Sequence, residues 1–184
     1  MSKTSQPENP VYSKNTIEFV AVAKSFCDFM DQLESIDKQQ FLDTMVRLLP
    51  LLYLKASLLP PNDLLSDDPQ EEFATEDQYA VLAQTISELL GTDDAYLEVF
   101  HSDIKFTDTP VAVFISENLS DIWQDLFNFL SVFRLGYDET MNDALYLCRT
   151  NFEQFWGQSL VNVLRAVHNC KYPTVGLEEE GDEF

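Results

Sequence analysis

The chain has 184 residues, of which 45% are hydrophobic and 12% aromatic, and its formal net charge at pH 7 is −21. A chain of this length and apolar content can bury enough surface to fold as one globular domain. The charge argues against nucleic acid as a partner and against an anionic membrane surface, because excess carboxylates repel phosphates. With only five glycines, a glycine-dependent β architecture is not expected.

The N-terminal segment and the cysteines bear on cellular location. The first ten residues, MSKTSQPENP, lack the apolar core of a secretory signal. The longest strongly apolar run, Leu48 to Leu54, contains Pro50 and is too short to span a bilayer. Cys27, Cys148 and Cys170 are odd in number and form no CxxC pair, which argues against disulfides and a zinc ribbon. We therefore expect a reduced, cytoplasmic protein with no membrane contact.

The first half of the chain predicts two helices after a polar leader. Residues 1–12 carry two prolines and are interpreted as flexible. Asn15, with Glu18 as its capping-box partner, is expected to begin the first helix. Asp37 is expected to begin the second, in which Pro50 removes a backbone donor and should produce a kink.

The middle of the chain predicts one helix followed by an irregular insert. Thr75 caps the third helix, and Gly91 ends it in the manner of a left-handed C-terminal cap. Helical periodicity is then lost near residues 92–115. Two short β-prone runs lie in this insert, Tyr96 to Phe100 and Val111 to Ile115, so we expect it to be irregular or hairpin-like.

The last third predicts a helical hairpin. Ser116 begins the fourth helix and Gly136 ends it, while Asp138 begins a long final helix that runs to about Lys171. Gly157, near the middle of that helix, is the expected place for a bend. The short turn between the two helices makes them antiparallel neighbours.

The predicted fold class is therefore all-α, a five-helix antiparallel bundle with a small insert. We assign residues 13–172 to a single helical domain. Residues 173–184, which end in EEEGDEF, are interpreted as an acidic disordered tail.

Three segments carry a resemblance to a known family: LLPLLYLKASLLP (Leu48–Pro60), FISENLSDIWQDL (Phe114–Leu126) and NFEQFWGQSLVNVLRAVH (Asn151–His168). Together they resemble the bacterial family known as domain of unknown function 5063. The likeness covers nearly the whole chain except the first dozen residues and the acidic tail. It implies a helical bacterial protein, and it brings no activity, substrate or catalytic residue.

Catalytic and metal-binding motifs find little support. Glu98 and His101 form a single Glu-x-x-His, whereas a di-iron bundle needs two such pairs and two further glutamates. The other histidine, His168, has no glutamate three residues before it. The chain also has no Gly-x-Ser-x-Gly elbow and no phosphate-binding glycine loop. We predict no catalytic residue, no metal site and no cofactor, and we lean towards a protein that is not an enzyme.

A stripe of carboxylates recurs every four residues on the predicted fourth helix, at Glu117, Asp121 and Asp125. Such a stripe could serve acid–base chemistry or bind a divalent cation. A solvated face near a helix N-terminus accounts for it equally well and is the preferred interpretation.

All four arginines lie inside apolar helical runs, at Arg47, Arg134, Arg149 and Arg165. On the last helix a rough polar stripe lies beside Trp156 and consists of Gln154, Gln158, Arg165 and His168. We predict there a pocket for an anionic ligand, lined by Trp156, Gln158, Arg165 and His168. The preferred alternative is that the arginines form ion pairs that tie helices together.

The acidic centre of the chain is the strongest interaction signal. Between Lys55 and Lys105 there is no Lys or Arg, while twelve Asp or Glu occur. Repulsion within such a segment costs stability, so its persistence calls for a reason. The predicted docking residues for a basic protein partner are Asp67, Asp68, Glu71, Glu72, Glu76 and Asp77. The alternative, a merely solvated face, is about equally well supported and is slightly preferred.

Three functional hypotheses follow. The first is a non-enzymatic acidic helical module for protein interaction. The second is a small-molecule or anion-binding protein, with an enzyme included, that uses the pocket on the last helix. The third, with least support, is an acidic protein that mimics DNA. The oligomeric state is not predicted.

Overall fold

The computed structural model describes residues 9–66, 69–98 and 111–173. The main helices are α1 (Lys14–Met30), α2 (Lys38–Ser57), α3 (Glu76–Leu90), α4 (Ile115–Phe133), α5 (Asp138–Asn151) and α6 (Gly157–Lys171). Short helical turns are η1 (Pro10–Tyr12), η2 (Leu33–Ser35), η3 (Gly91–Asp94) and the π-helical η5 (Phe152–Trp156). Strands β1 (Ala95–Glu98) and β2 (Val111–Phe114) pair antiparallel, with Ala95 opposite Phe114.

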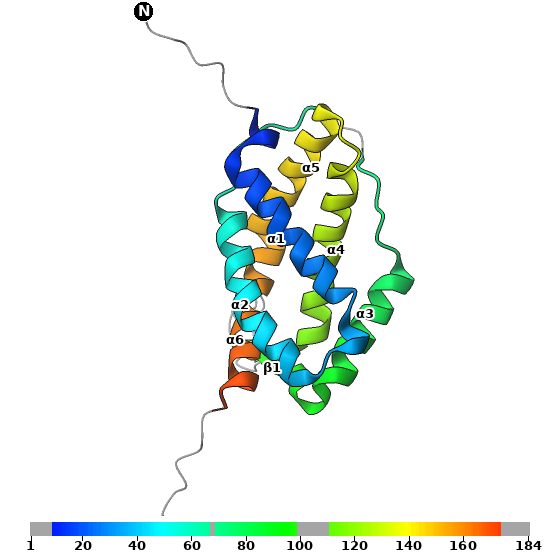
Figure 1. Ribbon diagram of the computed structural model, residues 1–184, viewed down its shortest axis with the longest axis vertical. Coiled ribbons are helices and arrows are strands. Elements are labelled where there is room, and N and C mark those ends of the chain that lie inside the picture. Colours follow the sequence, from blue (N-terminus) through cyan, green and yellow to red (C-terminus); the bar gives the residue numbers. More distant parts are fainter. Residues whose placement is uncertain (1–8, 67–68, 99–110, 174–184) are drawn as a thin grey trace, which may run out of the picture.

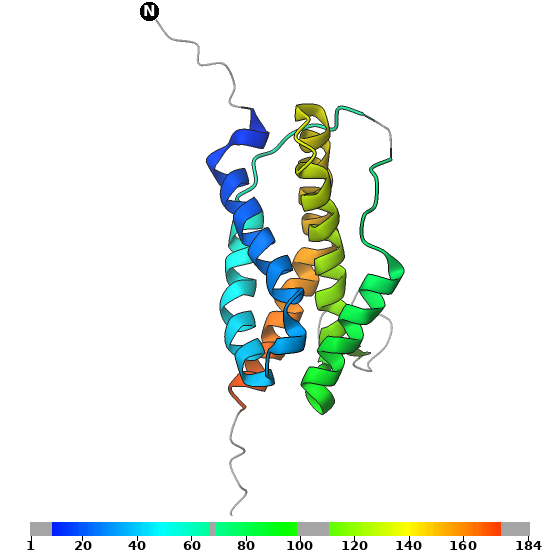
Figure 2. The same cartoon turned by 45° about the vertical axis from the view of Figure 1, so that its right-hand side comes forward.

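The fold is an elongated bundle of five helices, if α5, η5 and α6 are counted as one interrupted helix (Figure 1). Helices α1, α2, α4 and the α5–α6 rod lie side by side along the long axis. Helix α3 packs on the lower part of α4, at the edge of the bundle (Figure 2). The prediction of an all-α five-helix bundle with a small hairpin-like insert is confirmed.

One continuous core fills the bundle. Large side chains with almost no exposure come from every long helix, among them Phe19, Met45, Ile86, Leu119 and Trp156. Burial of each stabilises the fold by roughly 1.5–3 kcal/mol, which is the main force that holds the helices together.

With Asn15 as its N-cap, the first helix would begin at residue 16, but α1 begins two residues earlier, at Lys14. Ser13 is the N-cap, and its side chain accepts a hydrogen bond from Thr16 N at 3.2 Å. Asn15 instead donates to the carbonyl of Leu58 at 2.9 Å, and Glu18 pairs with Lys55. The predicted capping box at Asn15 is therefore wrong, because both of its side chains are used to fasten α1 to the end of α2.

Residues 9–12, which the sequence assigned to a flexible leader, belong to the folded body. Asn9 is the N-cap of η1, Val11 within η1 is buried, and the Tyr12 hydroxyl donates to the Asp138 carboxylate at the start of α5. The boundary of the domain therefore lies at or before Asn9. Residues 1–8 and the acidic tail from 174 onward lie outside the described residues.

Three other predicted helix signals are confirmed. Asp37 caps α2 by accepting from Gln40 N at 2.8 Å, and Thr75 caps α3 in a reciprocal capping box with Gln78. Gly91 ends α3 as predicted; its φ is +61°, which residues with a Cβ rarely adopt, but its ψ of −126° lies outside the left-handed helical region of the expected cap. Helix α2 continues through Pro50 as a single helix.

The long C-terminal helix is interrupted by the π-helical turn, which immediately precedes Gly157. The Gly157 amide donates back to the carbonyl of Phe152. A Cβ atom at residue 157 would lie only 2.4 Å from that carbonyl oxygen. The predicted irregularity thus has a specific cause, since only glycine lets the two backbones approach this closely.

The start of α4 is capped from outside the helix. Asp94, which is buried in η3, accepts from Ser116 N and from Ser116 Oγ, both at 2.8 Å. Asp94 therefore links the residue before β1 to the start of α4, which are the two ends that the β1–β2 hairpin connects. No helix in the described part of the chain has the length and apolar character needed to cross a membrane.

Candidate functional site

The structure does not bring the predicted anion-pocket residues onto one face. Trp156 is buried, and its indole N–H donates to the carbonyl of Cys148 at 3.3 Å. Gln158, Arg165 and His168 all lie on the exposed face of α6. Residues two apart on a helix face different sides, so Trp156 and Gln158 cannot line one pocket.

The exposed members of this set have local partners. Gln158 donates to Asn162 at 3.1 Å, and the His168 ring lies 4.9 Å from that of Tyr172. Arg165 forms no ion pair with an acid of the described residues. None of the three cavities described below is lined by any of the four predicted residues, so the geometry lends the anion-pocket hypothesis no support.

Among the described residues, the ion pairs that tie distant elements together are formed by lysines, while Arg149 does so by a hydrogen bond that its guanidinium donates to the Asn62 carbonyl at 3.3 Å. Three pairs do so: Lys55 with Glu18, Lys38 with Asp93, and Lys171 with Asp43. Arg149 pairs within its own helix segment, with Glu153 at 2.8 Å. Arg47, Arg134 and Arg165 are exposed. The preferred interpretation of the arginines therefore holds only for Arg149, and even there the pair spans one helical turn.

The acidic stripe on α4 has structural partners. Asp121 accepts from the Tyr79 hydroxyl at 2.8 Å, which fastens α3 to α4. Asp125 accepts from Asn151 at 2.7 Å, which fastens α5 to α4. Burial raises the pKa of Asp125, and the nearby Asp121 charge raises it further. Glu117 is exposed. Two of the three carboxylates thus already have structural hydrogen-bond partners.

The thiols are poorly suited to nucleophilic chemistry. Burial raises the pKa of Cys27 to about 12, and it raises the pKa of Cys148 and of Cys170 as well. All three cysteines are free. In the described part of the chain no group of three His, Cys, Asp or Glu residues is placed to hold a metal ion. His101 and the side chain of Glu98 lie outside that part.

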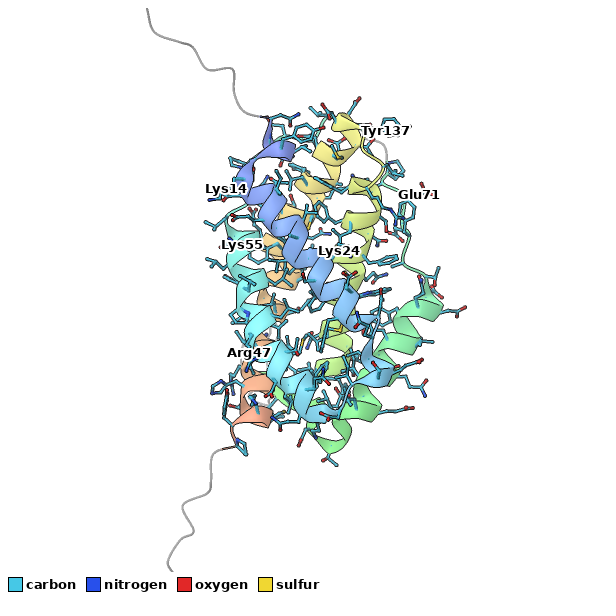
Figure 3. All side chains as sticks on the ribbon, in the orientation of Figure 1. Lys14, Lys24, Arg47, Lys55, Glu71 and Tyr137 are labelled. Atoms are coloured by element: carbon cyan, nitrogen blue, oxygen red, sulfur yellow. The ribbon has the colours of Figure 1, made fainter. Side chains whose placement is uncertain are left out.

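The predicted partner-binding residues lie at the entry to α3. Glu71, Glu72, Glu76 and Asp77 are all exposed, and within the described residues none forms an ion pair. Asp67 and Asp68 lie outside the described residues. We refer to residues 69–77 as the acidic segment. In Figure 3 the labelled cations lie over α1 and α2, whereas Glu71 lies on the side of α4 and α3.

The acidic segment is fastened to the bundle. The side-chain oxygen of Asn128, on α4, accepts from Phe73 N at 2.7 Å and from Ala74 N at 2.8 Å. The Thr75 capping box then begins α3. The backbone between Glu72 and Glu76 is therefore held in place, and no cation in the described ranges pairs with the carboxylates on either side of it.

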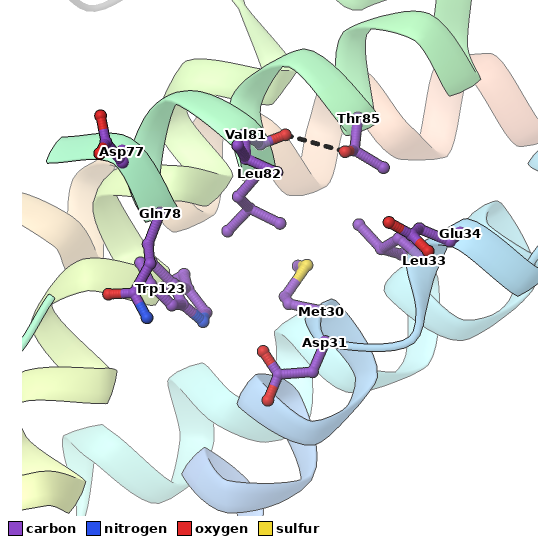
Figure 4. Close-up of a pocket in the computed structure, with 10 residues that line it drawn as sticks. All are labelled: Met30, Asp31, Leu33, Glu34, Asp77, Gln78, Val81, Leu82, Thr85 and Trp123. Carbon is purple, nitrogen blue, oxygen red and sulfur yellow. Dashed lines mark hydrogen bonds between the residues drawn. The ribbon is translucent and has the colours of Figure 1, made fainter. Parts of the chain in front are cut away.

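A cavity of about 340 Å³ opens next to this array, between the end of α1 and helix α3 (Figure 4). We call it the α1–α3 groove. Its apolar walls are formed by Met30, Leu33, Val81, Leu82 and Trp123. Val81 is 62% exposed although it is apolar. The groove exists because α3 packs on α4 and leaves the side facing α1 without a neighbouring helix.

Trp123 forms the floor of the groove. The residue is only 4% exposed, and its indole nitrogen has no hydrogen-bond acceptor among the residues that the structure describes. In Figure 4 the edge of the ring that carries this nitrogen faces the space enclosed by α1 and α3. A buried donor without a partner costs roughly 1–3 kcal/mol, so this site retains an unused hydrogen-bonding capacity.

The rim of the groove is acidic. It carries Asp31 and Glu34 on one side and Asp77 on the other, and none of these pairs with a cation of the described residues. Burial raises the pKa of Asp31, and the charge of Asp28 raises it further. All three rim carboxylates are exposed, so they are accessible to an incoming cation.

A second cavity, of about 480 Å³, lies between α1 and α4 and shares Asp31 with the groove. Phe127 lines it, and this ring stacks on Trp123 with 4.9 Å between centroids. A third cavity, of about 360 Å³, lies between the chain near Gln70 and the start of α5. The third cavity also adjoins the predicted partner-binding residues, through Glu71, and holds the unpartnered Gln70 side-chain nitrogen, but most of its lining residues are polar. The α1–α3 groove adjoins them through Asp77 and combines an unpartnered indole N–H with mainly apolar walls.

The sequence did not predict the groove, although Asp77, one of the predicted partner-binding residues, lies on its rim. Trp123 fits a helical stripe of apolar residues, and nothing in that stripe distinguishes a packed indole from one that lines a cavity. Met30 and Leu33 likewise fit the core pattern of the first helix. The position of α3 relative to α1 is set by long-range packing, which local periodicity does not encode.

Comparisons with known proteins agree with this architecture. The model of the family described as Domain of unknown function (DUF5063) matches residues 10–173. The chain belongs to this family. The crystal structure of protein BF1032 from Bacteroides fragilis, a structural genomics target, is 43% identical in sequence, with a TM-score of 0.80. The alignment covers 91% of this chain and 99% of that one. A search among curated proteins finds no significant match.

Proposed function

We propose that this DUF5063 protein is a non-enzymatic interaction module that binds a basic region of another protein through its acidic segment and α3. The observation that carries the proposal is the array of Glu71, Glu72, Glu76 and Asp77, which is exposed, has no ion-pair partner among the described residues and lies on either side of the anchored Phe73 and Ala74. Fixed charges of one sign attract a partner of the opposite sign and orient its approach.

Two features support binding over catalysis. The three cysteines have raised pKa values, and two of the three carboxylates of the α4 stripe already have structural partners. The cytoplasm is the proposed location, in keeping with three free thiols.

Affinity capture with the full chain tests the proposal. The variant Glu71→Gln/Glu72→Gln/Glu76→Gln should lose most of the captured partner, and capture by the native chain should weaken as salt rises from 50 to about 300 mM. The matched control, Asp63→Asn/Glu117→Gln/Glu153→Gln, changes the net charge by the same amount at exposed sites that line none of the three cavities. Equal capture by native chain and variant, or capture insensitive to salt, would refute the proposal.

A further inference from the structure

We propose that the α1–α3 groove receives a basic peptide segment of the partner, with one large apolar side chain inserted against Trp123 and flanking Lys or Arg residues on the acidic rim. This inference rests on the proposed function and specifies the contact. It follows from the shape, the charge and the unused donor of the groove, taken in turn below.

The shape selects the anchor. A cavity of about 340 Å³ with walls of Met30, Leu33, Val81 and Leu82 accommodates one or two aliphatic or aromatic side chains. Such a side chain would cover the exposed Val81 and remove apolar surface from water on both partners. A partner that is only basic would leave this surface uncovered.

The rim selects the charge. Asp31 at the end of α1, Glu34 in η2 and Asp77 in α3 surround the apolar walls, and none of them forms an ion pair within the described part of the chain. Lys24, the nearest lysine along α1, is already paired with Asp28. The three carboxylates are therefore available to an incoming Lys or Arg.

The unpartnered indole N–H of Trp123 favours a peptide as the ligand. The indole N–H of Trp123 needs an acceptor, and the nearby Gln78 side-chain oxygen is already used by Thr75 in the capping box. A backbone carbonyl of the bound peptide, next to the anchor side chain, would accept a hydrogen bond from the indole N–H. Because the nitrogen is nearly inaccessible to solvent, the groove walls would move slightly to admit this carbonyl. A helix interior has no free carbonyl, so the segment binds in an extended or turn conformation.

Nuclear magnetic resonance of the indole N–H groups tests this inference directly. The chain has two tryptophans, and the Trp123→Phe variant assigns the two signals. The probe is the peptide acetyl-KRKFLKRK-amide, and its control is acetyl-KRKGSKRK-amide, which keeps the charge and lacks the apolar pair. We expect the first peptide to shift the Trp123 signal saturably, while Trp156, whose N–H is bonded to Cys148, stays in place.

Variants locate the contact. Asp31→Asn/Glu34→Gln/Asp77→Asn should raise the dissociation constant of the first peptide at least tenfold. The control Asp63→Asn/Glu117→Gln/Glu153→Gln has the same net charge and should raise it less than threefold. Equal effects of the two variants would overturn the inference, because attraction would then be a property of net charge alone.

Three outcomes overturn the inference without deciding the proposed function. They are binding of both peptides with equal affinity, peptide binding that leaves the Trp123 signal unmoved, and a Trp123 shift produced by benzylamine but by neither peptide. The last outcome would make the groove a site for small apolar amines. The proposed function is decided separately by the salt-sensitive capture experiment, in which the groove residues Asp31 and Glu34 are left intact.

Discussion

Buried polar side chains in this protein act mainly as fasteners between segments far apart in sequence. Asn142 and Asp143, at the start of α5, hold the chain that follows α2. Asp143 accepts from the amides of Leu65 and Ser66 at 2.8 and 3.0 Å, and Asn142 donates to the carbonyl of Asp63. None of these roles could be predicted from sequence, because a polar residue in a helix pattern looks the same whether it faces water or a distant backbone amide.

Asp94 provides the clearest test of such a fastener. The Asp94→Ala variant should lower the free energy of unfolding by about 1–3 kcal/mol, because it leaves the buried amide and hydroxyl of Ser116 without their acceptor. Urea denaturation measures this change. The neighbouring Asp93→Asn variant removes a half-exposed ion pair with Lys38 and should cost less than about 1 kcal/mol. Equal losses in the two variants would contradict the capping role.

Asp125 should be a net cost to stability at neutral pH. Its pKa is raised by burial, so the folded state holds this proton more tightly than the unfolded state does. Stability is therefore lost as pH rises from the unfolded pKa through the folded one. We expect Asp125→Asn to raise the melting temperature at pH 7, since an amide oxygen can still accept from Asn151.

The pH dependence separates this effect from altered packing. The advantage of Asp125→Asn should shrink as the pH falls through the raised pKa towards 4, where the native carboxyl also becomes neutral. The exposed Glu117→Gln change on the same helix serves as control and should shift the melting temperature little at any pH. An advantage that is constant from pH 4 to 7 would count against the explanation.

At the scale of elements, helix starts and stops were well predicted where the signal is local. Asp37, Thr75 and Gly91 act as their residue types suggest. Prediction failed at Asn15 and at the placement of Trp156 beside Gln158. In the first case tertiary partners took over the side chain, and in the second the two residues face opposite sides of the same helix.

At the π-helical turn we expect a glycine-to-alanine substitution to have the opposite of its usual effect on stability. An alanine in place of glycine usually stabilises a helix interior by up to about 1 kcal/mol. At Gly157 the added Cβ would meet the Phe152 carbonyl at 2.4 Å and its ring at 2.9 Å. We expect Gly157→Ala to destabilise the protein by about 1–3 kcal/mol in thermal or urea unfolding. The adjacent exposed Gln158→Ala should be nearly neutral, and a stabilised Gly157→Ala would show that the turn is not required.

At the scale of the whole molecule, two electrostatic effects oppose each other. A net charge of −21 destabilises the compact state through repulsion, whereas the lysine pairs that tie helices together stabilise it. Repulsion should be the larger effect, because most carboxylates in the described part of the chain have no cation beside them and exposed ion pairs contribute little to stability. We expect the melting temperature to rise by a few degrees between 10 and 300 mM NaCl at fixed pH. A fall over that range would show that the lysine pairs dominate.

The fold class, the helix count and the acidic character of the α3 region could be predicted from sequence because each rests on periodicity, composition or charge. The α1–α3 groove could not, since it depends on which neighbour α3 lacks. Its floor and its walls come from residues that the sequence presents as ordinary core, such as Met30 and Trp123.

Site-specific photocrosslinking tests the groove most directly. With p-benzoylphenylalanine in place of Val81, on the wall of the groove, irradiation in cells should yield adducts whose linked peptide carries Lys or Arg beside a large apolar residue. The same group in place of Val161, which is 45% exposed on the outer face of α6, should yield few. Equal adducts at both positions, or linked peptides without basic residues, would contradict binding of a basic segment in the α1–α3 groove.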